Sequence, residues 1–226
     1  MSHVAAKGTR MARRPEWRRS QEERSSTTRT RLLEAAVESL AEVGASATTT
    51  PDVAKRAGLS RGAQQHHFNT KADLMLEVAR HVTERFHADL RAAVDDLPTG
   101  PDRIGAAIDV MWTAYNGPRA MAHTELWVAA RADPGLNQAL YEVERSLVPE
   151  TRVLLRRLFA EDDAHGEQVD IFVDLTAQFM RGLILRGMLK GAERWIERDL
   201  AAWKRVAEAT VPAIERGELR LGAGRR

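Results

Sequence analysis

The 226-residue sequence contains no cysteine, and none of its apolar runs approaches the roughly 20 residues that a membrane-spanning helix requires. Without cysteine the chain forms no disulfide, carries no catalytic thiolate and builds no zinc finger of the cysteine type. Its N-terminus is basic, but no apolar stretch follows, so it differs from a secretory signal. We therefore expect a cytoplasmic protein without a membrane partner.

The sequence also lacks the residue patterns of enzymes and metal proteins. It has no Gly-rich phosphate loop, no Ser–His–Asp arrangement and no pair of catalytic carboxylates. His66 and His67 are adjacent, so they would project in different directions from a helix, and no third ligand lies near them. We predict no catalytic activity, no cofactor and no metal site, with a helical enzyme as an alternative.

Charge is distributed unevenly along the chain. The formal net charge is +2, yet residues 1–75 carry thirteen Lys and Arg against eight Asp and Glu, an excess of five positive charges. The remaining residues therefore carry an excess of three negative charges. A basic front on an acidic body suits a head that binds a polyanion. A solvated basic tail explains the same charges equally well.

Strand pairs and internal repeats are absent, and apolar residues recur at helical spacing, so we predict an all-α fold. In residues 27–43 they form one stripe that ends at Gly44, a typical residue after a helix C-terminus. Two short helices follow, one beginning at Thr49 and the other at Ser60, and Thr70 opens a long helix. Thr49 and Thr70 each precede an aspartate by three residues, which is the capping-box pattern.

Residues 49–68 predict a helix-turn-helix. Two helices this short cannot bury a core alone, so the helix at residues 27–43 is needed against them, and Gly58 permits the tight turn between them. Arginine suits guanine and glutamine suits adenine in a major groove, and helix N-termini suit phosphates. The residues that we expect to contact DNA are Thr49, Thr50, Ser60, Arg61, Gly62, Ala63, Gln64, Gln65, His66, His67 and Lys71.

Within that set, Arg61, Gln64, Gln65 and His66 are expected to read base edges, because they offer donors and acceptors on the second short helix. Lys71 lies in the first turn of the long helix, where a positive charge opposes the helix dipole. An external phosphate is the more economical explanation for a lysine at that position.

These motifs resemble the DNA-binding domain of the tetracycline-repressor (TetR) family over about Arg29 to Arg80. The resemblance implies a homodimeric transcriptional regulator, a recognition helix at Arg61–His67 and a ligand cavity in a C-terminal helical domain. The chain departs from the family at Gln64-Gln65, where Leu-Tyr is usual, so the DNA contact of that tyrosine is in question. The resemblance is carried by Asp52-Val53-Ala54, Ala57-Gly58-Leu59-Ser60-Arg61-Gly62 and His66-His67-Phe68, with Lys71 and Leu74.

The chain therefore divides into four predicted parts. Residues 1–26 form a basic disordered arm, which either lies along DNA or makes no ordered contact. Residues 27–73 form the helix-turn-helix DNA-binding domain. Residues 74–218 form a helical regulatory and dimerisation domain, and residues 219–226 form a basic C-terminal tail.

Bulky apolar residues recur through the C-terminal domain. As a pocket they suit a hydrophobic or aromatic ligand, and as a core they need none. Gly182, Leu183, Ile184 and Gly187, with the final amphipathic helix, suit either a four-helix dimer interface or packing within one chain. The candidate ligand-lining residues are Met111, Trp112, Tyr115, Trp127, Phe172 and Phe179.

The predicted function is a sequence-specific DNA-binding transcriptional regulator: a homodimeric repressor on a near-palindromic operator, released by a small-molecule effector. A DNA-binding protein without ligand control, of nucleoid or scaffold type, is the alternative. A lactose-repressor-like headpiece would also fit Asp52–Ser60, but the alternating strands and helices that follow such a headpiece are missing.

Overall fold

A computed structural model describes residues 16–160 and 165–222, and every regular element within those ranges is helical. The all-α prediction is therefore confirmed. Within the same ranges, no helix has both the length and the apolar character to cross a membrane. The elements are α1 Glu16–Ala47, α2 Thr50–Arg56, α3 Arg61–His67, α4 Lys71–Asp95, the short 3-10 helix η1 Gly100–Asp102, α5 Arg103–Tyr115, α6 Pro118–Ala130, α7 Pro134–Phe159, α8 Gly166–Gly187 and α9 Glu193–Glu215.

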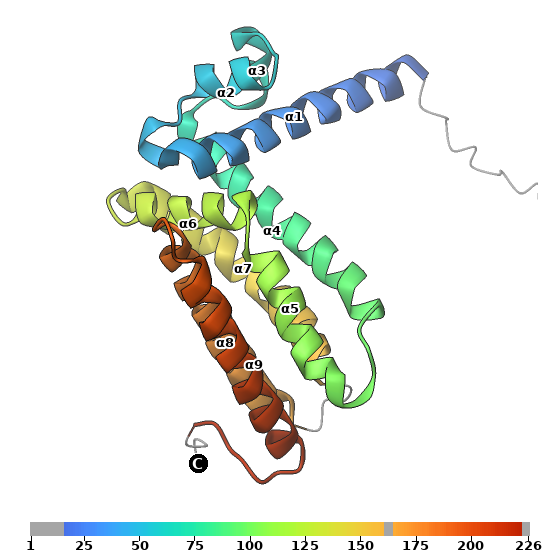
Figure 1. Ribbon diagram of the computed structural model, residues 1–226. Coiled ribbons are helices and arrows are strands. Elements are labelled where there is room, and N and C mark those ends of the chain that lie inside the picture. The colour runs from blue at the N-terminus through green and yellow to red at the C-terminus, as the bar shows by residue number, and fades with distance from the viewer. Residues whose placement is uncertain (1–15, 161–164, 223–226) are drawn as a thin grey trace, which may run out of the picture.

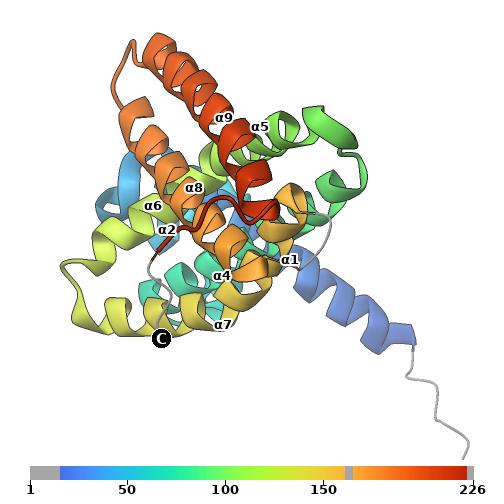
Figure 2. The ribbon, with the colours of Figure 1, turned by 90° about the horizontal axis from the view of Figure 1, so that it is seen from below.

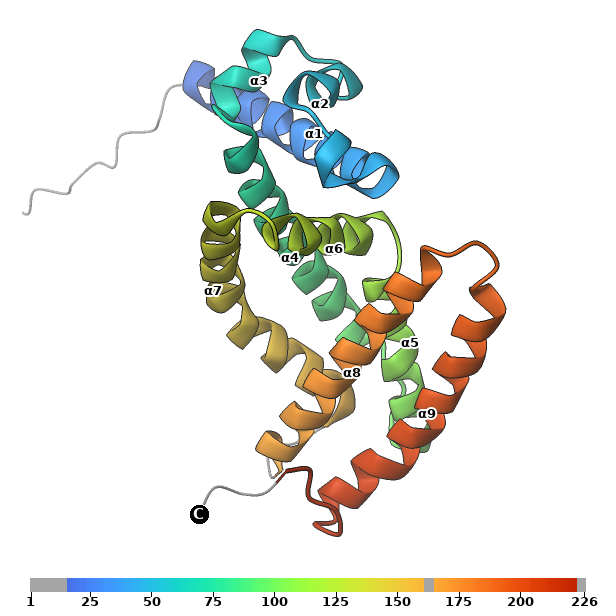
Figure 3. The ribbon, with the colours of Figure 1, turned by 90° about the vertical axis from the view of Figure 1, so that its left-hand side faces the viewer.

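The helices form a small head above a larger body (Figure 1). Helices α2 and α3 lie on one side of α1, and α6 lies across the opposite side and packs against it. Helix α4 descends from the head into the body beside α5 and α7. Helices α8 and α9 run side by side along one flank, as Figures 2 and 3 also show.

The head is held by the apolar stripe of α1, whose residues are spaced to lie on one helix face. Leu32, Ala36 and Leu40 are fully buried there. The same core takes in Leu74 at the start of α4 and continues into Leu126 of α6. The predicted boundary at residues 73–74 is therefore not a break in packing, because one apolar core joins the helix-turn-helix to α6 and the first half of α7.

A second core lies between α5, α7, α8 and α9. Its largest fully buried side chains include Ile108, Met111, Phe172 and Met180. The ring of Phe172 meets that of Phe159 edge to face, with ring centroids 5.5 Å apart. This core packs α5, α7, α8 and α9 together, and the cavities described below lie beside these helices.

The first helix begins at Glu16, so the prediction that residues 1–26 are a disordered arm is wrong for residues 16–26. That segment lacks an apolar face, and sequence periodicity gives no signal for such a helix. Within this segment and just after it, the hydroxyls of Thr27 and Thr28 donate to the carbonyls of Glu23 and Arg24, each at 2.8 Å. Residues 1–15 of the predicted arm lie outside the described residues. Figure 2 shows the start of α1 projecting beyond the other helices.

Gly44 interrupts α1 with φ +78° and ψ 169°, a combination that is essentially restricted to glycine. The predicted helix end at Gly44 is thus confirmed as a kink, after which one short turn continues to Ala47.

At the other end of the chain, the predicted basic tail partly packs on the body. The N–H of Leu221 donates to the side-chain oxygen of Gln168 at 2.5 Å, and residues 223–226 lie outside the described residues.

Candidate nucleic-acid interface

Helices α2, α3 and α4 each begin after a hydroxyl side chain that accepts a backbone N–H. The distances are 3.3 Å from Asp52 N to Thr49 Oγ1 and 3.2 Å from Ala63 N to Ser60 Oγ. Thr70 forms the complete capping box with Asp73, with both hydrogen bonds at 3.0 Å. At the start of α2 only half of the predicted box forms, because the Asp52 carboxylate accepts from the Thr49 hydroxyl instead of the backbone, at 2.6 Å.

The turn between α2 and α3 depends on Gly58, which has φ +65°. The N–H of Leu59 closes the turn by donating to the Ala54 carbonyl at 2.9 Å. Arg31 of α1 donates to the Ala57 carbonyl at 2.6 Å and so occupies an acceptor at the C-terminal end of α2. These contacts hold the two short helices in a fixed orientation on α1.

Helix α3 has one exposed side and one buried side. Arg61, Gly62, Gln65 and His66 are exposed. Gln64 is only 3% exposed, and its side-chain N–H donates to the Phe68 carbonyl at 2.8 Å.

The prediction that Gln64 reads base edges is therefore wrong for this structure. Gln64 precedes Phe68 by four residues, about one helical turn, so both side chains face the core. Its hydrogen-bonding capacity is used within α3, where it closes the C-terminal end of that helix.

Lys71 also differs from its prediction. The side chain is exposed at the start of α4, but its ammonium donates to the Ala45 carbonyl near the end of α1, at 2.7 Å. This internal acceptor accounts for a lysine where the helix dipole disfavours one, and no external phosphate is needed to explain it.

The cations of the head fall into two groups. Arg56 is paired with Glu42 and Glu38, and Arg29 is paired with Glu77. Arg61 and Lys55, by contrast, make no ion pair or side-chain hydrogen bond among the described residues. Positive charge that is free to meet a phosphate or a base is therefore present on α2 and α3.

The remaining predicted contact residues surround that charge. Thr49 and Ser60 are exposed, whereas Thr50, Ala63 and His67 are partly buried. Burial lowers the pKa of His67, and the nearby His66 and Arg29 lower it further. A lowered pKa favours the neutral imidazole, so His67 is suited to hydrogen bonding more than to charge pairing with phosphate.

The six predicted ligand-lining residues do not form one site. Met111 and Phe172 belong to the body core, and Phe179 stacks on Trp203 with ring centroids 4.6 Å apart. Trp112 lines a separate hollow of about 360 Å³ between α1, α5 and α8. Only Tyr115 and Trp127 line the same hollow, of about 320 Å³, between α6 and α8.

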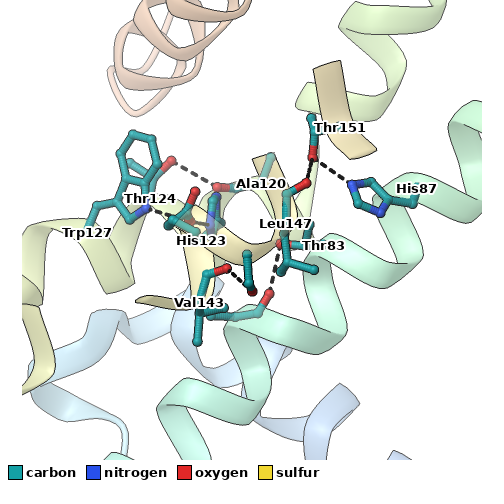
Figure 4. Close-up of polar contacts among 12 residues, drawn as sticks. Thr83, His87, Ala120, His123, Thr124, Trp127, Val143, Leu147 and Thr151 are labelled. Atoms are coloured by element: carbon teal, nitrogen blue, oxygen red, sulfur yellow. Dashed lines mark hydrogen bonds and ion pairs between the residues drawn. The ribbon is translucent and has the colours of Figure 1, made fainter. Parts of the chain in front are cut away.

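Sequence reasoning missed three polar residues that meet Tyr115 and Trp127 there or next to them. They are His123 of α6, Glu144 of α7 and Arg181 of α8. Because they lie on three different helices, no spacing along the chain could have grouped them. Figure 4 shows His123 and Trp127 on α6, and Thr151 of α7 beside His87 of α4.

This geometry defines a class of protein: a DNA-binding regulator whose helix-turn-helix is mounted on a helical body. The sequence profile described as "Bacterial regulatory proteins, tetR family" matches residues 32–78, which span the second half of α1, both short helices and the start of α4. The chain belongs to the TetR family of DNA-binding transcriptional regulators, as the resemblance of its motifs implied.

Curated relatives extend the similarity over most of the chain. The HTH-type transcriptional regulator CymR of Pseudomonas putida is 32% identical over 199 residues, covering 86% of this chain and 92% of CymR. An HTH-type transcriptional regulator of Mycobacterium tuberculosis is 30% identical over 176 residues, covering 77% of this chain and 90% of its own. These relatives are regulators, which agrees with the prediction that the chain is not an enzyme.

Solved structures share the fold. A transcriptional regulator from Rhodococcus sp. Rha1 aligns with a TM-score of 0.58 at 21% identity, covering 85% of this chain and 99% of that one. GusR of Salmonella enterica aligns with a TM-score of 0.58 at 17% identity, covering 83% and 95%. The head and the helical body thus occur together in other regulators.

Proposed function

We propose that the protein is a homodimeric repressor that binds a near-palindromic operator and is released from it by a small molecule. The observation that carries the DNA-binding part is the exposed side of α3. It presents an unpaired guanidinium, Arg61, together with the hydrogen-bonding side chains of Gln65 and His66. A major groove admits such a helix, and Arg and Gln match the edges of guanine and adenine.

The remaining proposed contacts, to phosphates, would fix the position of α3 along the DNA. The N-termini of α2 and α3, at Thr49 and Ser60, supply free backbone N–H groups for phosphates, and Lys55 supplies a mobile charge. Gly62 and Ala63 have small side chains, so the backbone at the start of α3 can approach DNA closely. Lys71 retains two ammonium protons beyond its bond to Ala45 and contributes in a secondary way.

The dimer is proposed on the flank formed by α8 and α9. Large apolar side chains are exposed there, including Leu175, Trp195 and Val206, each about half exposed. Monomers rarely leave a contiguous apolar patch in water. A Cβ at Gly182 would meet no atom within 4 Å, and this glycine lines the hollow between α6 and α8. Leu183 and Ile184 belong to the body core and do not take part.

Release is proposed to pass through α6, because this helix touches both parts of the molecule. One side of α6 packs against α1, where Glu125 accepts the backbone N–H of Ala45. The other side carries His123 and Trp127 toward the hollow between α6 and α8. A ligand that displaces α6 would tilt the head, and a differential affinity of a few kcal/mol is enough to shift such an equilibrium.

The test is selection of bound duplexes from a random DNA pool by the full-length protein. The proposal expects a consensus with twofold symmetry and half-sites about one helical turn apart, roughly 34–36 Å. Enrichment without symmetry would contradict the dimer, and no enrichment would favour a sequence-independent DNA-binding protein. Thermal-shift screening then tests ligand control, because a compound that stabilises the protein should also lower its affinity for the selected duplex.

A further inference from the structure

Two hollows in the body meet at one arginine. The inner hollow, of about 90 Å³, lies between α4, α6 and α7, and the outer one, of about 320 Å³, lies between α6 and α8. Both are lined by Tyr115, Ala120, His123 and Arg181. The outer volume falls within the range of small-molecule sites, about 300–1,000 Å³. The side chain of Arg181 thus borders both hollows.

Arg181 has an unusual environment for a half-buried cation. Its guanidinium carbon lies 4.8 Å from the centre of the Trp127 ring and 5.7 Å from that of Tyr115. In the part of the chain that the structure describes, no carboxylate pairs with it and no acceptor takes its N–H groups. Other arginines of the body differ: Arg119 is paired with Asp89, and Arg156 is paired with Asp170.

Glu144, the acidic residue that lines the inner hollow, does not accept a hydrogen bond from Arg181. Glu144 Oε1 lies 2.6 Å from His123 Nε2 and accepts from Trp127 Nε1 at 3.2 Å. Burial raises the pKa of Glu144, but the hydrogen bonds from His123 and Trp127 and the charge of Arg181 lower it to a net value below the ordinary one. Glu144 is therefore an ionised group that already has two donors.

The walls of the site are apolar and aromatic. The rings of Phe86 and Tyr115 meet edge to face, with centroids 5.1 Å apart, beside Leu147 in the inner hollow. Trp127 and Leu185 line the outer hollow. Aromatic rings prefer edge-to-face or offset contacts with other rings, so these walls suit an aryl group.

We infer that the two hollows beside Arg181 bind a small aromatic carboxylate, with the carboxylate on Arg181 and the ring against Phe86 and Tyr115. The inference deepens the proposed function, on which its regulatory meaning rests. A cationic ligand is disfavoured because Arg181 already covers the ring faces of Trp127 and Tyr115 that would attract it. A neutral ligand would bury the guanidinium further without supplying an anionic acceptor for its N–H groups.

The experiment is isothermal titration calorimetry on the full-length protein without DNA. The probes are phenylacetate, 3-phenylpropanoate and 2-naphthoate, each compared with its primary amide and with an amine of the same carbon skeleton. At least one carboxylate should bind about tenfold more tightly than its amide, since a charge-assisted bidentate pair is stronger than a neutral hydrogen bond. The amines should bind more weakly than the amides.

Variants assign the effect to Arg181. Arg181→Gln should remove the preference for carboxylate over amide, whereas Arg181→Lys should keep part of it because the charge is retained. Arg145→Gln is the matched control, because Arg145 is 69% exposed on α7 and pairs with Glu142. A carboxylate preference that persists in Arg181→Gln, a preference for amines, or no heat from any carboxylate at about 10 mM would each overturn the inference.

The two proposals fail separately. If the random pool yields a symmetric operator but no carboxylate binds, the ligand inference is overturned and the repressor proposal stands. If a carboxylate binds through Arg181 and no duplex is enriched, the site stands and the repressor proposal fails.

Discussion

Glu125 of α6 accepts a hydrogen bond from the backbone N–H of Ala45, with 3.2 Å between Oε2 and N, directly after the kink of α1 at Gly44. The contact joins residues that are eighty positions apart in the sequence and ties the head to the body. It depends on the kink, because a straight α1 would keep the Ala45 N–H in its own helical hydrogen bond.

Gly44→Ala should destabilise the protein by about 1–3 kcal/mol, since the backbone there is nearly restricted to glycine. A Cβ at this position would also lie 3.0 Å from Glu125 Oε2. Chemical denaturation measures the change. Gly62→Ala is the control, because a Cβ there meets nothing closer than 3.9 Å, and it should be neutral or slightly stabilising. Equal stability of the two variants would contradict this account of the kink.

Gln64→Ala should lower the free energy of unfolding by about 1–3 kcal/mol, because it leaves the Phe68 carbonyl without its donor and opens space in the core. The base preference of the remaining folded protein should not change. Gln64→Leu should restore packing and bind the same consensus. A relaxed consensus in Gln64→Leu would mean that Gln64 turns outward to read DNA.

Protonation of His87 should make the protein less stable in mild acid. The side chain is 2% exposed, its Nε2 lies 2.6 Å from Thr151 Oγ1, and burial lowers its pKa despite Glu150 nearby. A pKa below the unfolded value of 6.5 means that unfolding takes up a proton, so stability is full above that pH and falls as pH decreases below it. His87→Gln should flatten part of this fall in denaturation curves between about pH 7 and 5. An unchanged slope would contradict the assignment.

Val206→Glu should convert the proposed dimer to a monomer, because Val206 is 45% exposed on α9, on the flank assigned to the interface. Light scattering after size exclusion measures the mass. Val153→Glu is the matched control, since Val153 is 52% exposed on α7 and should leave the mass unchanged. A dimer that survives in Val206→Glu places the interface elsewhere.

The sequence alone was sufficient where local physics decides the structure. The caps at Ser60 and Thr70, the turn at Gly58 and the apolar stripe around Leu40 were all readable, because each depends on neighbours within one or two turns. The helical class followed from the same periodicity.

Prediction failed where contacts between residues distant in the sequence determine the position of a side chain. Gln64 looked like a base reader until its side chain was found against Phe68, and Lys71 looked free until Ala45 was found beside it. The grouping of His123, Glu144 and Arg181 depends on the packing of three helices, which no spacing encodes. Residues 16–26 were missed because their helix needs no apolar face.

The most direct measurement of the central claim is a binding titration of Arg61→Ala and Lys55→Ala on the selected duplex and on random DNA, at several salt concentrations. Arg61→Ala should cost about 1–3 kcal/mol on the selected duplex and much less on random DNA, because a base-reading contact is lost. Lys55→Ala should weaken both equally and reduce the salt slope by about one. If Arg61→Ala weakens both duplexes alike, or neither, then the exposed side of α3 does not read DNA sequence.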